Sequence, residues 1–357
     1  MGKRTNTARW IGERWRIDVQ KDGVRKSFYS SKPGRIGQRE ANEKADAWLD
    51  DNIDSKPRKV SDVYEMWMED LQMTTSQSNW RPVDARWRNW VIPMIGRKKV
   101  NALTEKDLQD IVNRMYADGK SKKSLTNLCA DLRAFCKFCR KAKFSTFTPE
   151  ELSIPAGARC KEKMVLQPTE LLVLFNSSET TYRGKVVEDA YINAYRFQVL
   201  VGLRPGELIG LRWEDVQGAT LLVKRSVNVF GEETRGKNEN AVRSVPLSAL
   251  AMYVLKKQRE MTGQDTGSIF EIRNEQHLYK RWRTYCTYHE LTPCSLYEIR
   301  HTFVSVVKTL PAGEIKALVG HSQDMDTFGV YSHELAGDDQ RTAQAVNDAF
   351  AKLLKLA

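Results

Sequence analysis

The chain has 357 residues, a formal net charge of +12 and a sequence isoelectric point near 9.3. This length predicts two or three compact domains, and the positive charge favours a polyanionic partner, either nucleic acid or an acidic membrane surface. No apolar run approaches the roughly 20 residues that span a bilayer and the N-terminus lacks the apolar stretch of a secretory signal, so we expect a cytoplasmic protein without membrane contact.

The first predicted unit is a small antiparallel sheet with one helix. Residues 9–30 alternate apolar and polar side chains around a turn at 21–23. A helix at about 38–52 can cover one face of this sheet, and a third strand fits before the helix. The polar segment 54–59 contains a proline and predicts a linker. We therefore place a first domain at residues 1–56.

The second predicted unit is a helical bundle at residues 57–150, followed by a linker at 151–165 that contains proline and glycine. Apolar residues recur at helical spacing over four stretches. These stretches are 60–72, 80–92, 104–118 and 121–142. The net charge is +4 over residues 1–56, +8 over 57–165 and zero over 166–357, so the basic excess lies in the N-terminal half.

The last helix of the bundle has an apolar side and a basic side. Its basic residues are Arg133, Lys137, Arg140 and Lys141, against the single acidic residue Asp131. Exposed helix surfaces usually carry both signs of charge, so this bias favours contact with DNA phosphates. An ordinary solvated basic face is the alternative interpretation.

Six cysteines are too few for a disulfide framework in a chain of this length. Cys136 and Cys139 have the spacing of metal ligands, but no second cysteine or histidine pair lies near them. On a helix they share a face with Leu128 and Leu132. We therefore interpret them as buried core residues and expect neither a metal nor another cofactor.

The third predicted domain, residues 166–357, is mostly helical with a β-hairpin. Helices are expected at 168–176, 187–201 and 206–211, the hairpin at 220–247, and further helices to the C-terminus. The predicted fold class is therefore mainly α with small β elements (α+β).

Four segments of this domain carry candidate catalytic residues. They are VGLRPGELIGL at 201–211, TRGKNENAVRSVPL at 234–247, SLYEIRHTF at 295–303 and LVGHSQDMDTFGVYSHE at 318–334. Cleaving a phosphodiester without a metal requires cations on the nonbridging oxygens, a proton donor for the leaving oxygen and a nucleophile held in line. Arg204 and Arg300 lie among apolar residues, where arginines are seldom unpartnered. A buried ion pair with Glu207 or Glu298 is the alternative to a phosphate clamp.

Together the four segments resemble the catalytic signature of the tyrosine recombinases, the family of phage and mobile-element integrases. The resemblance assigns Arg204 and Arg300 to the two arginines of the family, and Glu207 to the acidic residue that orients the first. Lys237 resembles the hairpin lysine that protonates the leaving 5′-oxygen, a role that suits a mobile ammonium group. An ordinary lysine in an exposed turn is the alternative at this position.

The last segment resembles the part of the family signature that holds the nucleophile. His321 follows Leu318-Val319-Gly320 and matches the family's phosphate-bonding histidine, with a core histidine as the alternative. Tyr331 matches the tyrosine that attacks the phosphate. Tyr297 departs from the family, which usually has histidine there; a tyrosine can donate a hydrogen bond but cannot shuttle a proton at neutral pH.

The resemblance implies a metal-independent, site-specific recombinase that integrates or excises a mobile element through a 3′-phosphotyrosyl intermediate. Double-stranded DNA is the implied partner, held by a homotetramer in a C-shaped clamp built from arm-binding, core-binding and catalytic domains. Host DNA-bending or excision accessory proteins are further candidate partners. Two alternatives remain open: a catalytically decayed sequence-specific DNA-binding protein, and a strand-passing enzyme similar to type IB topoisomerases.

The C-terminal segment 341–357 is amphipathic, with apolar residues at helical spacing. This pattern predicts a helix that packs on another surface. The helix either closes its own domain or, as the resemblance implies, docks on a neighbouring protomer.

Overall fold

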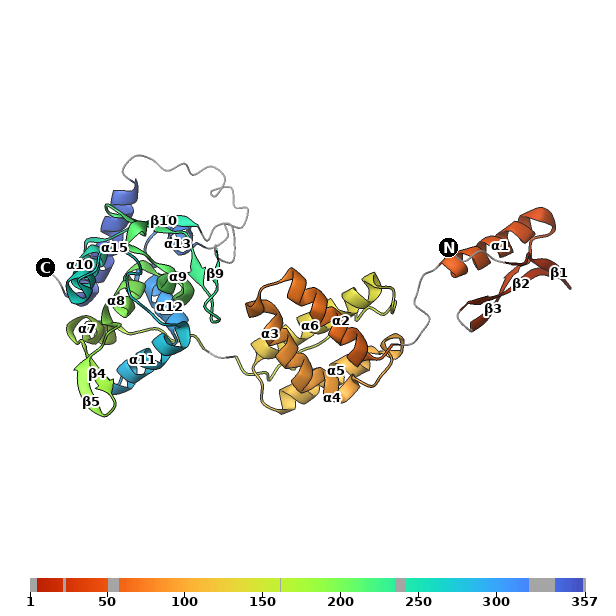
Figure 1. Cartoon of the computed structure of the whole chain (residues 1–357), viewed down its shortest axis with the longest axis horizontal. Helices are drawn as coiled ribbons and strands as arrows, with labels where there is room; N and C mark the ends of the chain where they lie inside the picture. The colour runs from red at the N-terminus through yellow and green to blue at the C-terminus, as the bar shows by residue number, and fades with distance from the viewer. Residues whose placement is uncertain are drawn as a thin grey trace. The chain divides into compact units, whose positions relative to one another are not determined.

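The computed structural model describes residues 5–21, 24–50, 58–160, 162–234, 242–320 and 338–355. It divides into two compact units, Met1–Lys161 and Glu162–Ala357. Figure 1 labels the helices and strands of both. The first unit contains two separate hydrophobic cores and the second contains one. Within the described ranges, no helix is both long enough and apolar enough to cross a bilayer.

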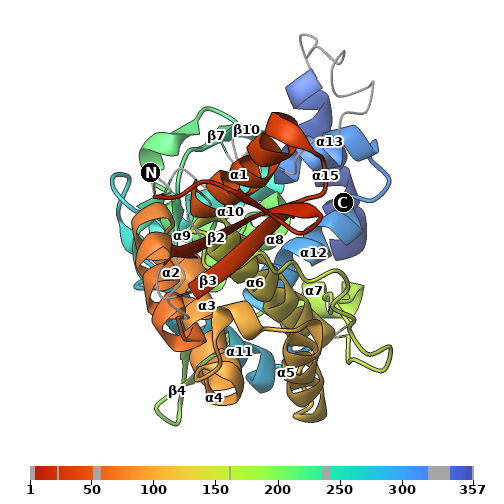
Figure 2. The ribbon, with the colours of Figure 1, turned by 90° about the vertical axis from the view of Figure 1, so that its right-hand side faces the viewer.

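The N-terminal sheet and helix are confirmed. Strands β1 (Arg9–Ile11), β2 (Arg14–Lys21) and β3 (Val24–Ser30) are antiparallel in the order β1-β2-β3, and α1 (Gly34–Asp50) packs against β2 and β3. Figure 2 shows this helix lying over the sheet. Their shared core consists of Ala8, Ile17, Val19, Ala41, Ala45 and Leu49. One detail of the prediction is wrong: the third strand precedes the other two instead of lying directly before the helix. Gly12, with φ +64°, makes the tight turn from β1 into β2.

The predicted helical bundle is also confirmed. Its helices are α2 (Val60–Thr74), α3 (Gln77–Arg86), α4 (Ile92–Ile95), α5 (Glu105–Ala117) and α6 (Lys122–Lys141), with the π-helical turn η1 (Trp87–Val91) joining α3 to α4. Stacked and edge-on aromatic rings fill the centre of the bundle, from Tyr64, Trp67, Trp87 and Phe135. The chain after α6 forms no helix or strand as far as residue 160, but Leu152 and Ala158 are buried in the same core.

The second unit is mostly helical, as predicted. Its helices are α7 (Pro168–Asn176), α8 (Ile192–Val201), α9 (Pro205–Gly210), α10 (Ala249–Thr262), α11 (Glu275–Tyr288), α12 (Leu296–Val306), α13 (Ala312–Val319) and α15 (Asp338–Leu354). The helix predicted from residue 187 begins only at Ile192. Before it, β4 (Glu179–Tyr182) and β5 (Lys185–Glu188) form a hairpin whose turn residues Arg183 and Gly184 both have positive φ, as two-residue hairpin turns require.

The hairpin predicted at 220–247 is a nested pair of hairpins. The outer pair joins β7 (Thr220–Val223) to β10 (Arg243–Pro246), and β6 (Val216–Gln217) extends this sheet. The inner pair joins β8 (Ser226–Val227) to β9 (Glu233–Thr234). The outer hairpin returns β10 to the domain core, where Val245 is buried.

Helix α15 closes its own unit. Val346, Phe350 and Leu354, spaced one turn apart, are buried in the core of the second unit, and Phe350 stacks on Phe303 of α12. The sequence left open whether the C-terminal segment closes its own domain or docks on a neighbouring protomer. In the structure it packs within its own chain.

Replacing Phe350 with alanine should lower the free energy of unfolding of the second unit by about 3 to 5 kcal/mol, because a fully buried aromatic side chain leaves a cavity. Denaturant unfolding of the chain without DNA measures this change, with the exposed Lys352→Ala as the matched control. A helix that served only to dock on another protomer would leave unfolding of the free chain unchanged in both variants.

Candidate active site

The first candidate arginine and its acidic partner are placed by one short helix start. Arg204 is the N-cap of α9, with Pro205 as the first helical residue and Glu207 at the third position. The Glu207 carboxylate accepts from the Arg204 backbone N–H at 2.9 Å and from Arg204 Nη1 at 2.7 Å. A side chain at Gly206 would collide with β8, since a Cβ there would lie 2.5 Å from Ser226 Oγ. The Arg-Pro-Gly-Glu sequence thus fixes a buried carboxylate beside the Arg204 guanidinium.

The second candidate arginine, Arg300, lies in the middle of α12 and is only 2% exposed. Its Nη1 donates to the Gly202 carbonyl at 3.0 Å and lies 3.9 Å from Glu207 Oε2. Gly202 ends α8 at φ +70°, and a Cβ there would lie 2.4 Å from the Phe303 ring. Both candidate arginines thus face the buried Glu207 carboxylate, whereas the Glu298 carboxylate caps the start of its own helix.

Sequence reasoning missed a third arginine at this carboxylate. Arg243 begins β10, and its side chain is 7% exposed; its Nη1 and Nη2 donate to the two Glu207 oxygens at 3.1 and 2.9 Å. The signal was available, because Arg243 lies two residues before the buried Val245 and so shares its inward strand face. Its partner, Glu207, could not be predicted from the sequence of the strand by itself, because Glu207 lies on α9.

The three guanidinium groups also hold three consecutive carbonyls at the C-terminus of α13. Arg243 Nε donates to Leu318 O at 2.8 Å, Arg300 Nη2 donates to Val319 O, and Arg204 Nη2 donates to Gly320 O at 3.0 Å. These carbonyls lie in the last turn of the helix, where C=O groups lack intrahelical partners and the helix dipole is negative. Helix α9, strand β10 and helices α12 and α13 are therefore tied together by one charge cluster.

The cluster carries more positive than negative charge. Burial opposes ionisation of the Glu207 carboxyl, but its hydrogen bonds and ion pairs with Arg243 and Arg204 outweigh burial and lower its pKa below the ordinary value. Burial, together with the charges of Arg204 and Arg243, lowers the pKa of Arg300 to about 10, so Arg300 stays protonated at neutral pH. Three guanidinium groups around one carboxylate leave an excess of two positive charges, which suits binding of a phosphate group.

Tyr297 and His301 lie one turn apart on α12. Tyr297 is 42% exposed, and its ring meets the His301 ring edge-on at 5.4 Å. Burial, followed by the charge of Lys163, lowers the pKa of His301, which is half-buried. The phenol of Tyr297 is thus accessible at the start of the helix that carries Arg300.

The chain that enters the second unit is bonded to α12 on both sides of Arg300. The Met164 backbone N–H donates to Glu298 Oε1 at 3.2 Å, and the Leu166 N–H donates to Thr302 Oγ1 at 3.0 Å. Glu298 and Thr302 are both buried. The entering segment therefore restrains the helix that positions Arg300.

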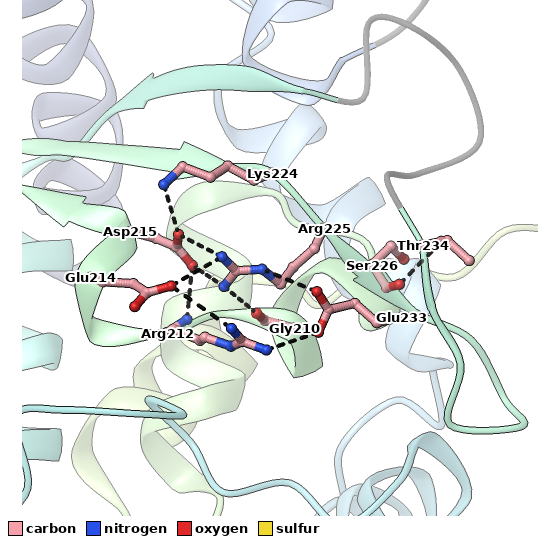
Figure 3. A network of polar contacts seen from close by, with 9 residues as sticks. All are labelled: Gly210, Arg212, Glu214, Asp215, Lys224, Arg225, Ser226, Glu233 and Thr234. Carbon is pink, nitrogen blue, oxygen red and sulfur yellow. Dashed lines mark hydrogen bonds and ion pairs between the residues drawn. The ribbon is translucent and has the colours of Figure 1, made fainter.

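A second charge network supports the elements next to Arg204 (Figure 3). The buried Asp215 carboxylate is paired with Arg225 at 2.8 Å, and Arg225 Nε lies 3.6 Å from Glu233 of β9. Glu233 in turn accepts from Arg212 at 2.9 Å. Since Arg225 precedes β8 and also donates to the Gly210 carbonyl at the end of α9, the network joins the inner hairpin to that helix.

The remaining candidate catalytic residues, Lys237, His321 and Tyr331, lie outside the described residues. The structure therefore gathers Arg204, Glu207 and Arg300 and places Tyr297 on the helix of Arg300. The roles of all these side chains in catalysis stay predictions from the resemblance.

The basic side of α6 is more uniform than the sequence indicated. Asp131 does not belong to this side, because it is buried and paired with Arg86 at 2.6 Å. Arg133, Lys137 and Lys141 are exposed and Arg140 is half-buried. The backbone carbonyls of Leu152 and Phe147 accept hydrogen bonds from Arg133 and Arg140, at 3.4 and 3.2 Å respectively. Lys137 and Lys141 thus lie on the exposed side of α6, whereas Asp131, the acidic residue of this helix, is buried on another side.

The cysteine pair of α6 behaves as core. Burial raises the pKa of Cys136 to about 11 and that of Cys139 to about 12, which disfavours the thiolate form that metals bind. Among the described residues, no three histidine, cysteine or acidic side chains gather in a way that could hold a metal ion. Cys160 is exposed, whereas the other five cysteines are buried.

Comparisons with known proteins agree with this fold. Residues 165–337 match the Phage integrase family, and residues 59–116 match the N-terminal SAM-like domain of phage integrases. A "Tyrosine recombinase XerC-like" protein of Caldanaerobacter subterraneus subsp. tengcongensis is 22% identical over 98% of this chain and 100% of its own length. The ICEBs1 integrase of Bacillus subtilis is 20% identical over 71% of this chain and 73% of its own length.

Solved structures show the same fold. The Tn1549 transposon integrase in complex with transposon right end DNA superposes with a TM-score of 0.63 at 17% identity, over 80% of this chain and 98% of that one. A lambda integrase tetramer bound to a Holliday junction gives a TM-score of 0.58 at 14% identity, over 90% and 96% of the two chains. The family match and the named recombinase relatives place the chain among the DNA strand transferases of the tyrosine type. The chain belongs to the phage integrase family and is a tyrosine recombinase.

Replacing Glu207 with glutamine should lower the free energy of unfolding by about 3 to 5 kcal/mol at pH 7, because the buried Arg243 and Arg300 and the half-buried Arg204 lose their counter-charge. A carboxyl group with a lowered folded-state pKa stabilises the protein above its unfolded-state pKa, and this contribution is lost as the pH falls through the folded value. The difference between wild type and variant, measured by denaturant unfolding, should therefore shrink below about pH 4. A difference that is constant from pH 7 to pH 3 would contradict the ionised state of Glu207.

Proposed function

We propose that this tyrosine recombinase integrates or excises a mobile element by cutting and rejoining double-stranded DNA through Tyr331. The observation that carries the proposal is the buried Glu207 cluster, whose excess positive charge suits a phosphodiester. Such a charge on a preorganised, largely buried site stabilises the pentavalent phosphate of the transition state more than it would in water.

The proposed reaction exchanges one phosphodiester for another. The Tyr331 phenol gives up its proton to solvent and its oxygen attacks the scissile phosphorus; a bond forms between them, and the bond from phosphorus to the 5′-oxygen breaks. Lys237 donates a proton to the leaving 5′-oxygen, and the product is a 3′-phosphotyrosyl bond. Attack by the 5′-hydroxyl of another strand reverses these steps and frees Tyr331. Because the bond energy is conserved, no nucleotide hydrolysis is required.

The other proposed site residues act on the nonbridging oxygens. Arg204 is the more accessible arginine, with a side chain 25% exposed, so it is placed to donate directly to phosphate. Arg300 contributes positive charge from the protein interior, because the Arg300 side chain is nearly fully buried. Tyr297 and His321 contribute hydrogen bonds; the exposed phenol of Tyr297 replaces the histidine found at this position in the family.

The proposed assembly is a homotetramer on DNA in the bacterial cytoplasm. The lambda integrase chain that shares this fold is a tetramer bound to a Holliday junction, which supports the proposal. We further propose the three-part division into residues 1–56 for arm-type sites, 57–150 for core sites and 166–357 for catalysis, closing as a C-shaped clamp. Host DNA-bending or excision proteins are proposed as accessory partners.

A nicked suicide duplex spanning an end of the element tests the chemistry. Wild type should form a covalent protein–DNA adduct on a denaturing gel without divalent metal, and Tyr331→Phe should form none while binding the duplex with unchanged affinity. Because only the phenolic oxygen is removed, the two proteins differ in the proposed nucleophile alone.

Two results would contradict the proposed function. Binding without an adduct from wild type would favour the catalytically decayed DNA-binding protein. Relaxation of supercoiled plasmid of any sequence, with no recombinant products, would favour a strand-passing enzyme of the type IB kind.

The basic side of α6 should contact DNA phosphates, with Lys137 and Lys141 among its exposed members. Replacing Lys137 with alanine should weaken binding to specific and unrelated duplexes alike and reduce the slope of log affinity against log salt concentration by about 1. Fluorescence anisotropy from 50 to 300 mM salt measures the slope, and the exposed Lys257→Ala in α10 is the control. Equal slopes for both variants and wild type would show that α6 makes no phosphate contact.

A further inference from the structure

Arg243 makes the most extensive set of contacts within the charge cluster. It reaches both Glu207 oxygens with its two Nη groups and the Leu318 carbonyl with Nε. Only arginine has three nitrogens in one planar group that can make these bonds together. Lysine has a single nitrogen, which cannot reach both oxygens of a carboxylate and a separate carbonyl in the same way. With a side chain only 7% exposed, Arg243 faces the protein interior.

The groups that Arg243 holds are the same groups that hold the two candidate phosphate-binding arginines. Glu207 orients Arg204 at 2.7 Å and lies 3.9 Å from Arg300. The C-terminal turn of α13 supplies the neighbouring carbonyls Val319 O and Gly320 O to those arginines. Any shift of Glu207 or of this turn therefore moves Arg204 and Arg300 together.

We infer that Arg243 is a positioning residue for strand cleavage: it locks Glu207 to the C-terminus of α13, and this lock sets the geometry of Arg204 and Arg300. The inference rests on the proposed function of those two arginines. Arg243 itself makes no contact with DNA in this role. Its contribution is to the rate at which bound DNA is cleaved, because misplacing catalytic groups by about 1 Å can cost on the order of 100-fold in rate.

The interaction also differs from an ordinary stabilising ion pair. The same unit offers a matched example in Arg281, which is 12% exposed, pairs with the fully buried Asp189 at 3.1 Å and donates to the Thr181 carbonyl at 3.1 Å. Arg281 has the same chemistry as Arg243, a carboxylate on one side and a carbonyl on the other. Its partners, however, belong to the β4 hairpin region and make no bond to Arg204 or Arg300.

The test compares Arg243→Lys with Arg281→Lys in the full-length chain. Two quantities are measured for each: the affinity for a nicked suicide duplex, by gel shift, and the single-turnover rate of adduct formation at saturating DNA. Arg243→Lys should retain affinity within about threefold and lose rate on the order of 100-fold. Arg281→Lys should cleave at the wild-type rate, even if its melting temperature falls by as much as that of Arg243→Lys.

The outcomes separate this inference from the proposed function. If wild type forms no adduct, the proposed function is contradicted, and the inference about Arg243, which rests on it, falls as well. A wild-type adduct with an undiminished rate in Arg243→Lys overturns the inference, and so does a loss of affinity as large as the loss of rate, since that marks Arg243 as a DNA contact. If Arg243→Lys melts below the assay temperature, Arg243→Gln is measured in its place against the same criteria.

Discussion

The second unit depends on one buried carboxylate. Glu207 is 2% exposed and faces three guanidinium groups that arrive from a helix start, a strand and the middle of another helix. Like charges brought this close would repel, and burying them without a counter-charge would cost several kcal/mol each. The carboxylate makes the gathering possible, and the three carbonyls at the end of α13 accept the donors that the carboxylate cannot. The cationic cluster is thus already assembled in the protein without DNA. Charges that are fixed in place beforehand can stabilise a transition state without a rearrangement of the protein.

The surrounding fold is shaped to deliver these groups to one point. Two glycines allow the necessary close approaches: Gly202 turns the chain out of α8 against the Phe303 ring, and Gly206 lets α9 lie against β8. The network centred on Asp215 then fastens the inner hairpin to α9, and the segment from Met164 to Leu166 fastens α12. Short local motifs therefore set the direction of each arginine, while long-range hydrogen bonds set the distances between them.

Much of this arrangement could be predicted from the sequence. Periodicity located the helices of the bundle and the first three helices of the second unit to within a few residues, whereas the helices after residue 247 were predicted without bounds. The Arg-Pro-Gly-Glu motif predicted the pairing of Arg204 with Glu207. The prediction failed where local pattern and long-range pairing diverge. The hairpin of β4 and β5 was not predicted, and the end of β5 was assigned to the following helix, while the single long hairpin predicted at 220–247 contains a second hairpin inside it. Arg243 was missed for a similar reason, because the residue that explains it is 36 positions away. Asp131 was counted on the basic side of α6 because its partner, Arg86, lies on another helix.

The distribution of cysteines has a practical consequence. Thiol reagents attack the thiolate, and burial suppresses both its formation and its accessibility. Cys160 is the exposed cysteine among six, and it lies directly before Lys161, where the first compact unit ends. A maleimide dye should therefore attach at this one position in the unmodified chain. Its fluorescence would then report on the junction between the two units as the enzyme engages its substrate, without the need to remove any native residue.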